Sequence, residues 1–452
     1  MATDFPMLAS DTNNLSHSNC CSSTPCGSVD PALGESFRPQ GPGLQVVEFA
    51  FHVVDEADRQ HLSQSYWGWC ELFDRDSASR PSQHPDLLFA EANDGVVLCS
   101  ASQVGQVLAL GILAPKKMSL RQAGGFGLRA SVHGFRLVGN RLLGTADPAL
   151  TRQMLAACAT FVRDHHATFL LVEDLERNDP LFASTESLQQ DGFRLFSPTG
   201  IQERLKIEFP PNPTDYWAKF SSKTRNTFKR KQKKIGATRL LRITEPAQIA
   251  EFLEAAHTIS QRTWQSEKLG LRIHNNDAEL RFFTTLATQQ SLRSYLLFVD
   301  DKPAAFLIGT QHKGHFNYEE VGYDRDFADR SPGQVLLVQV LEDLLSDNPP
   351  RVFDFGGGAA DYKQLFATTA STSGSVWLVP PGVRPQLCLA YLRACRSLDR
   401  VARDIAKRIG ATTLLRQLIR GKLANSAAVG RSVDSAGDGH VENVPHEDGG
   451  AA

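Results

Sequence analysis

One short segment of the sequence combines residue types that suit the binding of a phosphate group. The sequence RSPGQV, residues 330–335, follows a predicted strand and opens a predicted helix. The first turn of a helix leaves backbone N–H groups without partners and carries the positive end of the helix dipole, so it attracts anions. Gly333 adds no side chain that would block such a ligand, and Ser331 is a residue type that caps helices. A plain Ser-Pro-Gly helix start is the alternative interpretation.

A second segment, DFGGGAADYK at residues 354–363, joins a glycine-rich strand end to ionisable side chains. Three consecutive glycines allow the backbone to approach a ligand closely. Tyr362 follows early in the next predicted helix, where its phenol could donate a proton or simply pack in the core. Asp354 is expected to orient Lys363 or a substrate, or to cap the glycine loop.

The elements that must position these two segments follow one another in a clear order. Alternating and continuous apolar runs predict strands, and apolar residues at three- and four-residue spacing predict helices. Two hairpin turns are expected at residues 300–302 and 313–314. The predicted elements are strands at 294–301, 303–311 and 316–324, a helix at 333–346, a strand at 351–355, a helix near 359–367 and a strand at 373–380.

The same order occurs once before in the chain. Its predicted elements are strands at 96–103, 106–115 and 132–140, a helix at 148–166, a strand at 168–175, a helix at 181–191 and a strand at 201–209. Both copies read βββ–α–β–α–β, which predicts an α/β fold with mixed central sheets flanked by helices. Two domains of one type are the economical interpretation, and an ordinary α/β chain with a coincidental order is the alternative.

Two predicted helices outside the copies are strongly basic. One runs from about residue 213 to 235 between the copies and carries eight basic residues and no acid in its second half. The other, a helix or helix pair at 384–422, alternates an apolar stripe with arginine and lysine. Such helices are suited to an anionic membrane or to nucleic acid, although a solvated face explains a basic helix more simply.

Length and composition limit the remaining possibilities. The 452 residues are enough for two domains, and the net charge of -2 indicates that any binding of a polyanion depends on local patches. The eight cysteines form no CxxC pair and no His cluster accompanies them, so no metal site and no disulfide framework are expected. No secretion signal or membrane span is expected, and an intracellular, cytoplasmic location fits best.

Four segments of the sequence together resemble bacterial GNAT-fold acetyltransferases of the CelD type, a group similar to the Fem-type aminoacyltransferases. They are YWAKFSSKTRNTFKRKQKK at 216–234, SQRTWQSEKLG at 260–270, GYDRDFADRSPGQVLLVQVLEDLL at 322–345 and FDFGGGAADYKQLFA at 353–367. The resemblance is close over about 200–380 and weaker over 44–200. It implies two tandem GNAT-like acyl-CoA N-acyltransferase domains followed by C-terminal helices.

These considerations predict a domain organisation along the chain. Its segments are a disordered stretch at 1–43, a first GNAT-like domain at 44–210, a basic linker helix at 211–236, a second, acyl-CoA-binding domain at 237–382, basic amphipathic helices at 383–424 and a disordered tail at 425–452.

The resemblance also implies how a donor would be bound. Members of the family bind the pyrophosphate of acetyl-CoA or another acyl-CoA with a Q/R-x-x-G-x-G/A loop, which residues 330–335 match except at the last position. The residues that the resemblance assigns to this role are Arg330, Ser331, Gly333, Gln334 and Val335.

Catalytic roles follow from the same resemblance. Tyr362 stands where a tyrosine of many GNAT enzymes protonates the departing thiolate, and Asp354 lies in the same segment. A general base often comes from the strand before the phosphate loop, where Glu319 and Glu320 are adjacent. We choose Glu320, because strict alternation would place it on one face with Tyr318 and Gly322.

Acceptor binding is expected from the segment before the second copy and from the glycine-rich segment. Arg262 and Trp264 are placed by the resemblance beside the acceptor, where an arginine can hold a carboxylate or phosphate. Lys363 is the third predicted substrate-binding residue. A surface arginine and a core tryptophan are the simpler interpretation of the first two.

The expected function is transfer of an acetyl or other acyl group from coenzyme A to an amino or hydroxyl acceptor, in polysaccharide or cell-envelope metabolism. A Fem-type enzyme that takes its amino acid from charged tRNA is one alternative, although nucleic acid is not the expected partner. A non-catalytic GNAT-fold scaffold on a membrane or partner surface is another. Peripheral contact with the inner face of an anionic membrane is compatible with the enzyme and with the scaffold.

Overall fold

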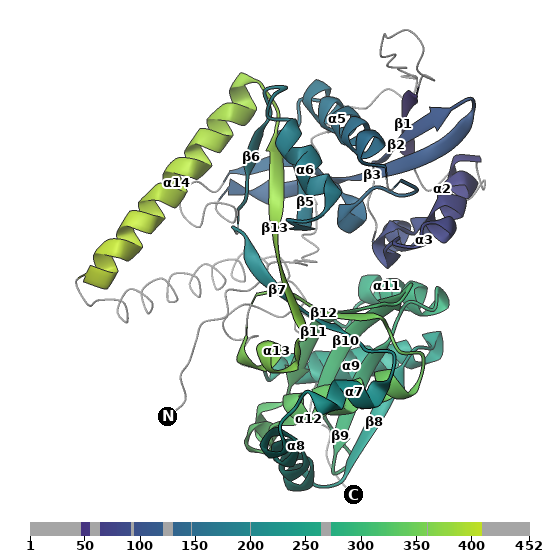
Figure 1. Ribbon diagram of the computed structural model, residues 1–452, viewed down its shortest axis with the longest axis vertical. Coiled ribbons are helices and arrows are strands. Elements are labelled where there is room, and N and C mark those ends of the chain that lie inside the picture. The colour runs from purple at the N-terminus through teal and green to yellow at the C-terminus, as the bar shows by residue number, and fades with distance from the viewer. Residues whose placement is uncertain are drawn as a thin grey trace, which may run out of the picture.

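The computed structural model describes residues 47–54, 64–91, 95–120, 130–145, 147–198, 200–263, 273–358 and 360–408. Its strands form one continuous mixed sheet of 13 strands that runs through the molecule, with helices packed on its faces (Figure 1). The molecule is therefore mixed α/β, as the sequence predicts. The two terminal segments that were expected to be disordered lie outside the described residues.

The first half of the molecule contains the first predicted copy of the element order. A strand and two helices precede it, and two strands, the first of the chain and a short one at residues 194–196, were not predicted. The elements are β1 (Glu48–Val54), α2 (Gln64–Arg75), η1 (Pro81–Gln83), α3 (Pro85–Ala90), β2 (Val96–Gln103), β3 (Gln106–Ser119), β4 (Ser131–Leu137), η2 (Val138–Asn140), α5 (Pro148–Asp164), β5 (Leu170–Glu176), α6 (Pro180–Ser187), β6 (Arg194–Phe196) and β7 (Gln202–Glu208).

The second half repeats this order. Its elements are β8 (Thr238–Ile243), η3 (Pro246–Gln248), α9 (Ile249–Gln261), α11 (Asp277–Thr288), β9 (Ser294–Val299), β10 (Lys302–His312), β11 (His315–Tyr323), η4 (Arg325–Arg330), α12 (Pro332–Ser346), β12 (Val352–Gly357), α13 (Asp361–Phe366) and β13 (Thr369–Val379). Both predicted hairpin turns are present. Positive φ at Asp300, Asp301, Lys313 and Gly314 gives them the backbone twist that two-residue hairpins favour.

The two halves exchange their last strands. Strand β7 ends the first half in sequence but pairs with β12 of the second half, and β13 ends the second half but pairs with β5 of the first. The order across the sheet is therefore β1-β2-β3-β4-β5-β13-β7-β12-β11-β10-β9-β8. In Figure 1, β7 and β13 pass between the upper and lower parts of the molecule. This exchange makes the two halves one continuous structure.

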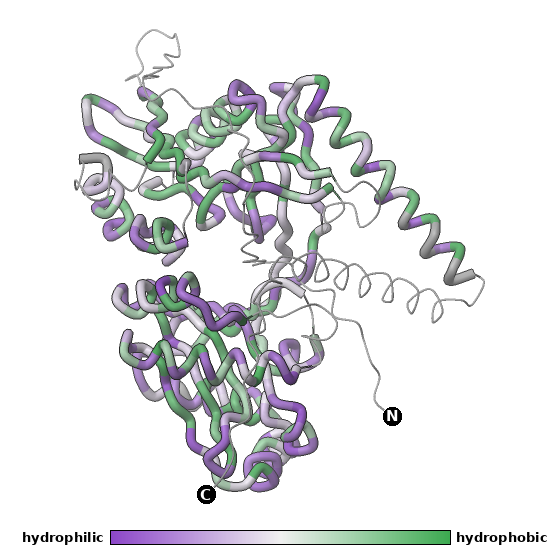
Figure 2. Tube along the Cα trace, turned by 180° about the vertical axis from the view of Figure 1, so that it is seen from behind, coloured by the Kyte–Doolittle hydropathy of each residue, from purple (hydrophilic) through white to green (hydrophobic). Residues whose placement is uncertain are grey.

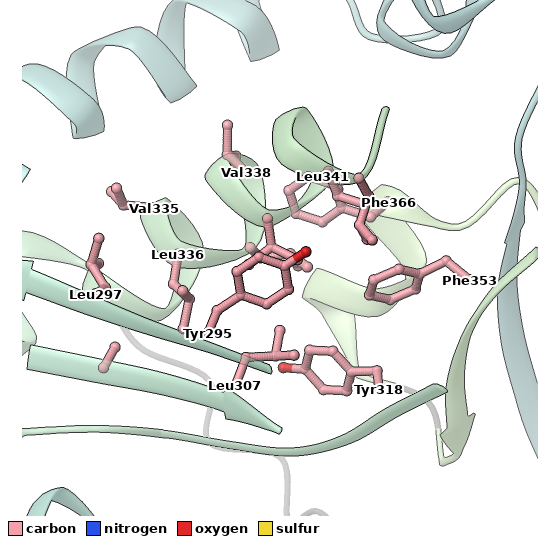
Figure 3. Packing of buried hydrophobic residues seen from close by; sticks show 14 of the residues in the cluster. Tyr295, Leu297, Leu307, Tyr318, Val335, Leu336, Val338, Leu341, Phe353 and Phe366 are labelled. Atoms are coloured by element: carbon pink, nitrogen blue, oxygen red, sulfur yellow. The ribbon is translucent and has the colours of Figure 1, made fainter. Parts of the chain in front are cut away.

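The core of the second half packs α12 on the sheet. Leu336 and Leu341 of α12 and Tyr295, Leu307 and Phe353 of the strands are all buried and belong to one apolar cluster (Figure 3). Complete burial of side chains of this size stabilises the fold by roughly 1.5–3 kcal/mol each. The cluster holds the first turn of α12 in a fixed position beside the end of β11.

The basic linker helix differs from its prediction. It consists of two helices, α7 (Pro213–Ala218) and α8 (Ser222–Ile235), because the chain turns at residues 219–221. The side chain of Ser221 accepts a hydrogen bond from the Thr224 amide and so begins a new helix. The first helix has no basic residue, so the basic residues lie in the second helix and, with Lys219, in the turn before it.

The C-terminal amphipathic helix is confirmed over α14 (Val383–Arg408), and the predicted continuation to residue 422 lies outside the described residues. Leu389 and Leu392 are buried against the first half, whereas Leu398 is 68% exposed. Alternating apolar and polar residues follow the whole helix in Figure 2. None of the helices in the described ranges combines the length and the apolarity needed to cross a bilayer.

The turn between β10 and β11 fastens the second half to the first. Lys313 donates hydrogen bonds to the carbonyls of Phe73, Asp74 and Asp76 at 2.7–2.8 Å. These carbonyls lie at the C-terminal end of α2, where the helix dipole favours a cation. The segment after α2 is therefore held against the start of β11.

Candidate functional site

Strands β11 and β12 run parallel but pair with each other only briefly. The ladder joins His315–Asn317 to Val352–Asp354. Beyond it, β11 continues to Tyr323 and β12 to Gly357 without further pairing between the two. The backbone N–H and C=O groups that face this unpaired stretch are available to an extended ligand that carries amides of its own.

Two tyrosines meet where the strands cease to pair. The hydroxyl of Tyr318 on β11 lies 3.4 Å from that of Tyr362 in α13. Burial raises the pKa of Tyr362, its hydrogen bond with Tyr318 lowers it by less, and the nearby charge of Glu320 adds a still smaller increase. Burial raises the pKa of Tyr318 well above its usual value. Both phenols therefore remain protonated at neutral pH, so each can donate a proton.

A β-bulge changes the expected directions of the two adjacent glutamates. Tyr318 lies opposite Gly309 and Glu320 lies opposite Ile308, so Glu319 is the extra residue in the strand. The alternation that grouped Glu320 with Tyr318 is therefore wrong across this position. Glu320 nevertheless lies near the tyrosine pair, because its charge raises the pKa of both phenols.

The start of α12 has the geometry of an anion site, although its serine does not cap it as expected. Ser331 adopts a left-handed conformation (φ 55°, ψ 51°), and its side chain forms no capping hydrogen bond. Instead its carbonyl accepts hydrogen bonds from the amides of Gln334 and Val335. A Cβ added to Gly333 would lie 3.5 Å from the Tyr323 ring, which is an ordinary van der Waals contact, so a larger side chain here would extend beside that ring.

The remaining residues of this loop have structural partners. Val335 is 1% exposed and packs in the core, so only its backbone could face a ligand. Arg330 pairs with Asp300 at 3.0 Å and lies over the Phe327 ring. Gln334 accepts a hydrogen bond from the ammonium of Lys231.

Two lysines of α8 flank the start of α12, and the sequence analysis did not assign them to the site. Lys231 contacts Gln334, and Lys234 donates to the carbonyl of Asp329. Their spacing of three residues places them on one side of the helix, which is the signal that could have identified them. Together with the helix dipole, they give this end of α12 a positive field.

Asp354 is enclosed in an ion-pair network. Both of its carboxylate oxygens accept hydrogen bonds from Arg204 Nε, at 3.0 and 2.8 Å, and one also accepts from the Gly356 amide. Of its predicted roles, capping of the glycine loop is thus the one that its contacts show. Lys363 donates to the Phe355 carbonyl at 2.8 Å, and burial lowers its pKa to about 8. Asp354 and Lys363 both fix the end of β12.

Of the predicted acceptor residues, Arg262 lies at the loop before α12. Arg262 ends α9 and pairs with Asp324 at 2.9 Å, where it supports the turn that leads into η4. Its side chain is more than half exposed. Trp264 lies outside the described residues.

The structure thus brings together Tyr362 and Glu320 at the unpaired strands, Asp354 and Lys363 at the end of β12, and residues 330–335 at the start of α12. It adds Tyr318, Arg204 and the two lysines, which the sequence analysis did not select. Arg204 was missed because a lone arginine in a strand carries no motif, and its partner is 150 residues away.

Comparison with known proteins agrees with this geometry. Residues 222–364 match the family model described as an acetyltransferase (GNAT) domain. No curated protein matches the sequence.

Among solved structures, the chain is similar to FemX, with 11% identity, a TM-score of 0.51 and coverage of 70% of this chain and 96% of FemX. It also matches the C-terminal domain of a putative lysylphosphatidylglycerol synthetase from Agrobacterium fabrum, with 13% identity, a TM-score of 0.46 and coverage of 73% and 95%. A tandem GNAT protein from the clavulanic acid biosynthesis pathway matches with 14% identity, a TM-score of 0.40 and coverage of 74% and 100%. At these identities the likeness concerns the fold.

Proposed function

Because the protein is an acyltransferase with a GNAT acetyltransferase domain at residues 222–364, we propose that it transfers an acyl group from coenzyme A to an amino or hydroxyl acceptor. The observation that carries this proposal is the unpaired stretch of β11 and β12, with the start of α12 at one side and the Tyr318–Tyr362 pair at the other. The CelD-type resemblance of the sequence is consistent with it and points to an acceptor from polysaccharide or cell-envelope metabolism.

The start of α12 is suited to the pyrophosphate of the donor. The amide of Gly333 contacts no acceptor among the described residues, and Pro332 before it has no N–H to contribute. Lys231 and Lys234 add two positive charges beside the positive end of the helix dipole. These groups together would neutralise much of the charge of a bound pyrophosphate.

The chemistry requires one proton to leave the acceptor and one to reach the sulfur. The nucleophilic atom of the acceptor forms a bond to the thioester carbonyl carbon, and the carbon–sulfur bond then breaks. We assign the proton of the departing thiolate to the Tyr362 hydroxyl and the proton of the acceptor to Glu320, whose charge acts on the same tyrosine. Tyr318 is placed to return a proton to Tyr362 through their hydroxyl contact.

Replacing Gly333 with phenylalanine tests the donor site. We expect acetyl-CoA affinity to fall at least tenfold, because the added ring meets Tyr323 and covers the amide at the start of α12. Gly68→Phe is the matched control, since a side chain at that helical glycine meets nothing within 4 Å. Calorimetric titration of both variants measures the effect, and unchanged affinity in Gly333→Phe would rule out the assignment of the phosphate loop.

An aminoacyl-tRNA donor is the second candidate, and the basic residues of α8 that stay exposed favour it. Arg225 and Lys234 donate to the carbonyls of Phe220 and Asp329, whereas those without a hydrogen-bond partner among the described residues are Lys223, Lys229, Arg230 and Lys233. Their replacement by glutamine would abolish transfer from an aminoacyl-tRNA by removing contacts to RNA phosphates. Transfer from acetyl-CoA in the absence of tRNA would exclude this candidate.

A non-catalytic scaffold on an anionic membrane is the third candidate, because α14 exposes Leu387, Leu398 and Ile405 between basic residues. The test replaces Leu387 and Leu398 with serine and leaves the buried Leu389 in place, so the fold keeps its contact with α14. Loss of pelleting with anionic liposomes would support membrane contact. Acyl transfer by the same protein would exclude a purely structural role.

A further inference from the structure

A row of charged side chains crosses the central strands on the sheet face opposite α12. Phe353 and Phe355 of β12 pack in the α12 core, so Asp354 between them points to the other face. Arg204 reaches the same face from β7, since its neighbour Leu205 lies in that core. Asp174 of β5 completes the row at 3.4 Å from Arg204. The strand exchange is what makes these strands neighbours.

Arg204 retains donor capacity in this row. Its Nε is fully used by Asp354, whereas its buried Nη1 lies in the 3.4 Å ion pair with Asp174 and makes no hydrogen bond with any described residue. The side chain is 6% exposed. Because this Nη1 is ion-paired but not hydrogen-bonded, a ligand that accepts from it would satisfy a buried donor.

The first half contributes two more arginines to the same place. Arg80 precedes η1, and its side chain forms no hydrogen bond or ion pair with the described residues. Arg141 makes only a 3.8 Å contact with Asp76, and its buried Nε has no acceptor in the described part of the chain. Three guanidinium groups therefore keep unused donors around one location.

The segment that carries Arg80 is held firmly in place. The side chain of Gln83 donates to the carbonyls of Val138 and Arg141 and accepts from the Arg80 amide. Ser79 contacts His312 of β10 at 3.1 Å. The position of Arg80 is thus fixed from both halves of the molecule.

This arrangement costs stability in the absence of a ligand. Burial lowers the pKa of Arg80, and the charges of Arg204 and Arg141 lower it further, while Asp354 and Asp174 act in the opposite direction. The group contains three cations and two anions, and both anions are already paired with Arg204. An additional anion would balance the set and satisfy the unused donors.

Glu319 links this cluster to the acyl site. It lies between Tyr318 and Glu320 on β11, and its exposed side chain accepts a hydrogen bond from Thr310 at 3.5 Å. Desolvation by the surrounding protein raises the pKa of its carboxyl. The charges of Asp174 and Asp354 raise this pKa further, and those of Arg204 and Arg80 lower it. A ligand beside Arg204 and Asp354 would therefore lie on the sheet face opposite Tyr318, which packs in the α12 cluster.

We propose that Arg80 and Arg204 bind a carboxylate or phosphate group of the acyl acceptor, so that the acceptor is an amine that carries its own anion. The inference rests on the proposed function and names its substrate class. The donor phosphates are an unsuitable occupant, because the start of α12 lies on the other face of the sheet. The amine of such an acceptor would lie toward Glu319 and the unpaired strands.

The test compares pairs of amines that differ in the anion. With acetyl-CoA as donor, glycine is compared with glycinamide and 2-aminoethyl phosphate with ethanolamine. We expect kcat/KM at least tenfold higher for the anionic member of one pair, and the preferred pair identifies carboxylate or phosphate. Equal rates for both members of each pair would overturn the proposal.

Variants assign the preference to the arginines. Arg80→Met should abolish it, mainly through KM, and should leave the melting temperature unchanged or higher, because Arg80 has no ion pair to lose. Arg163→Met, at an exposed arginine that pairs with Asp164, should retain the preference. Retention of the preference in Arg80→Met would contradict the proposal.

A titration without a donor distinguishes failure of the proposed acyl transfer from failure of the proposed anion site. If the protein binds no acetyl-CoA, the full chain is titrated with 2-aminoethyl phosphate and with glycine alone. Binding of one of them to the wild type but not to Arg80→Met supports the anion site on its own. No binding by the wild type overturns it. Loss of acetyl-CoA affinity in Arg80→Met would also overturn it, by assigning the arginines to the donor.

Discussion

The Tyr318–Tyr362 pair and the Arg204–Asp354 pair illustrate what single residues contribute to this site. The tyrosines lie at the unpaired strands with raised pKa values, and the ion pair holds the glycine-rich end of β12. From the sequence, Tyr362 and Asp354 could be selected because both lie in one motif. Their partners could not, since Arg204 is distant in the chain and the bulge at Glu319 leaves no composition signal.

Removal of the Tyr362 hydroxyl tests its role as proton donor. We expect Tyr362→Phe to lower kcat about 100-fold, with acetyl-CoA affinity retained, because general acid catalysis typically contributes at least this much. A phenol is active while protonated, so a raised pKa moves the high-pH loss of activity above its usual position near pH 10.

The pH profile of the wild type and the rate of the variant therefore give separate measurements. Tyr391→Phe is the control, because Tyr391 lies in α14 and packs against the apolar cluster that contains Phe169 and Trp377. A Tyr362→Phe enzyme with wild-type kcat would show that the hydroxyl only packs in the core.

At the scale of elements, local sequence patterns predicted the helices and hairpins but not the pairing of distant strands. Apolar spacing and turn residues located α12, the β9–β10–β11 hairpins and the repeated order, because these depend on neighbours in sequence. The exchange of β7 and β13 was not predicted. Its pairs, such as Trp377 with Leu171, join residues about 200 positions apart, and local sequence patterns carry no signal of such pairing. The break between α7 and α8 was missed because Ser221 was not recognised as a cap.

The exchange predicts that the halves unfold together. Trp377 of β13 stacks on Phe169 of the first half at 4.1 Å between ring centroids, although β13 is the last strand of the second half in sequence. Trp377→Ala should destabilise the protein by about 3–5 kcal/mol, as is typical for a large buried aromatic residue. Thermal unfolding followed by far-UV circular dichroism and by fluorescence should give one shifted transition.

The exposed Trp67 provides the control, because Trp67→Ala removes a ring that is 56% exposed and should have little effect on stability. Two separate transitions, of which Trp377→Ala shifts only one, would show that the halves are energetically independent despite the shared sheet.

At the scale of the whole molecule, the two halves have different shares in the proposed site. The second half holds the GNAT domain, the tyrosine pair and the start of α12, and the first half places Arg80 and Arg141 on the opposite face of the sheet. Sequence reasoning assigned all the site residues to the region from 262 to 363 because the recognisable motifs lie there. The contribution of the first half depends on how Lys313 and Gln83 fasten the halves together.

The most direct measurement of the central claim is thiol release from acetyl-CoA by the full chain, with the amine panel as acceptors and no tRNA present. We expect free coenzyme A and acetylated amine to appear in equal amounts, with both lost in Gly333→Phe and retained in Gly68→Phe. Absence of thiol release together with absence of acetyl-CoA binding would contradict the account.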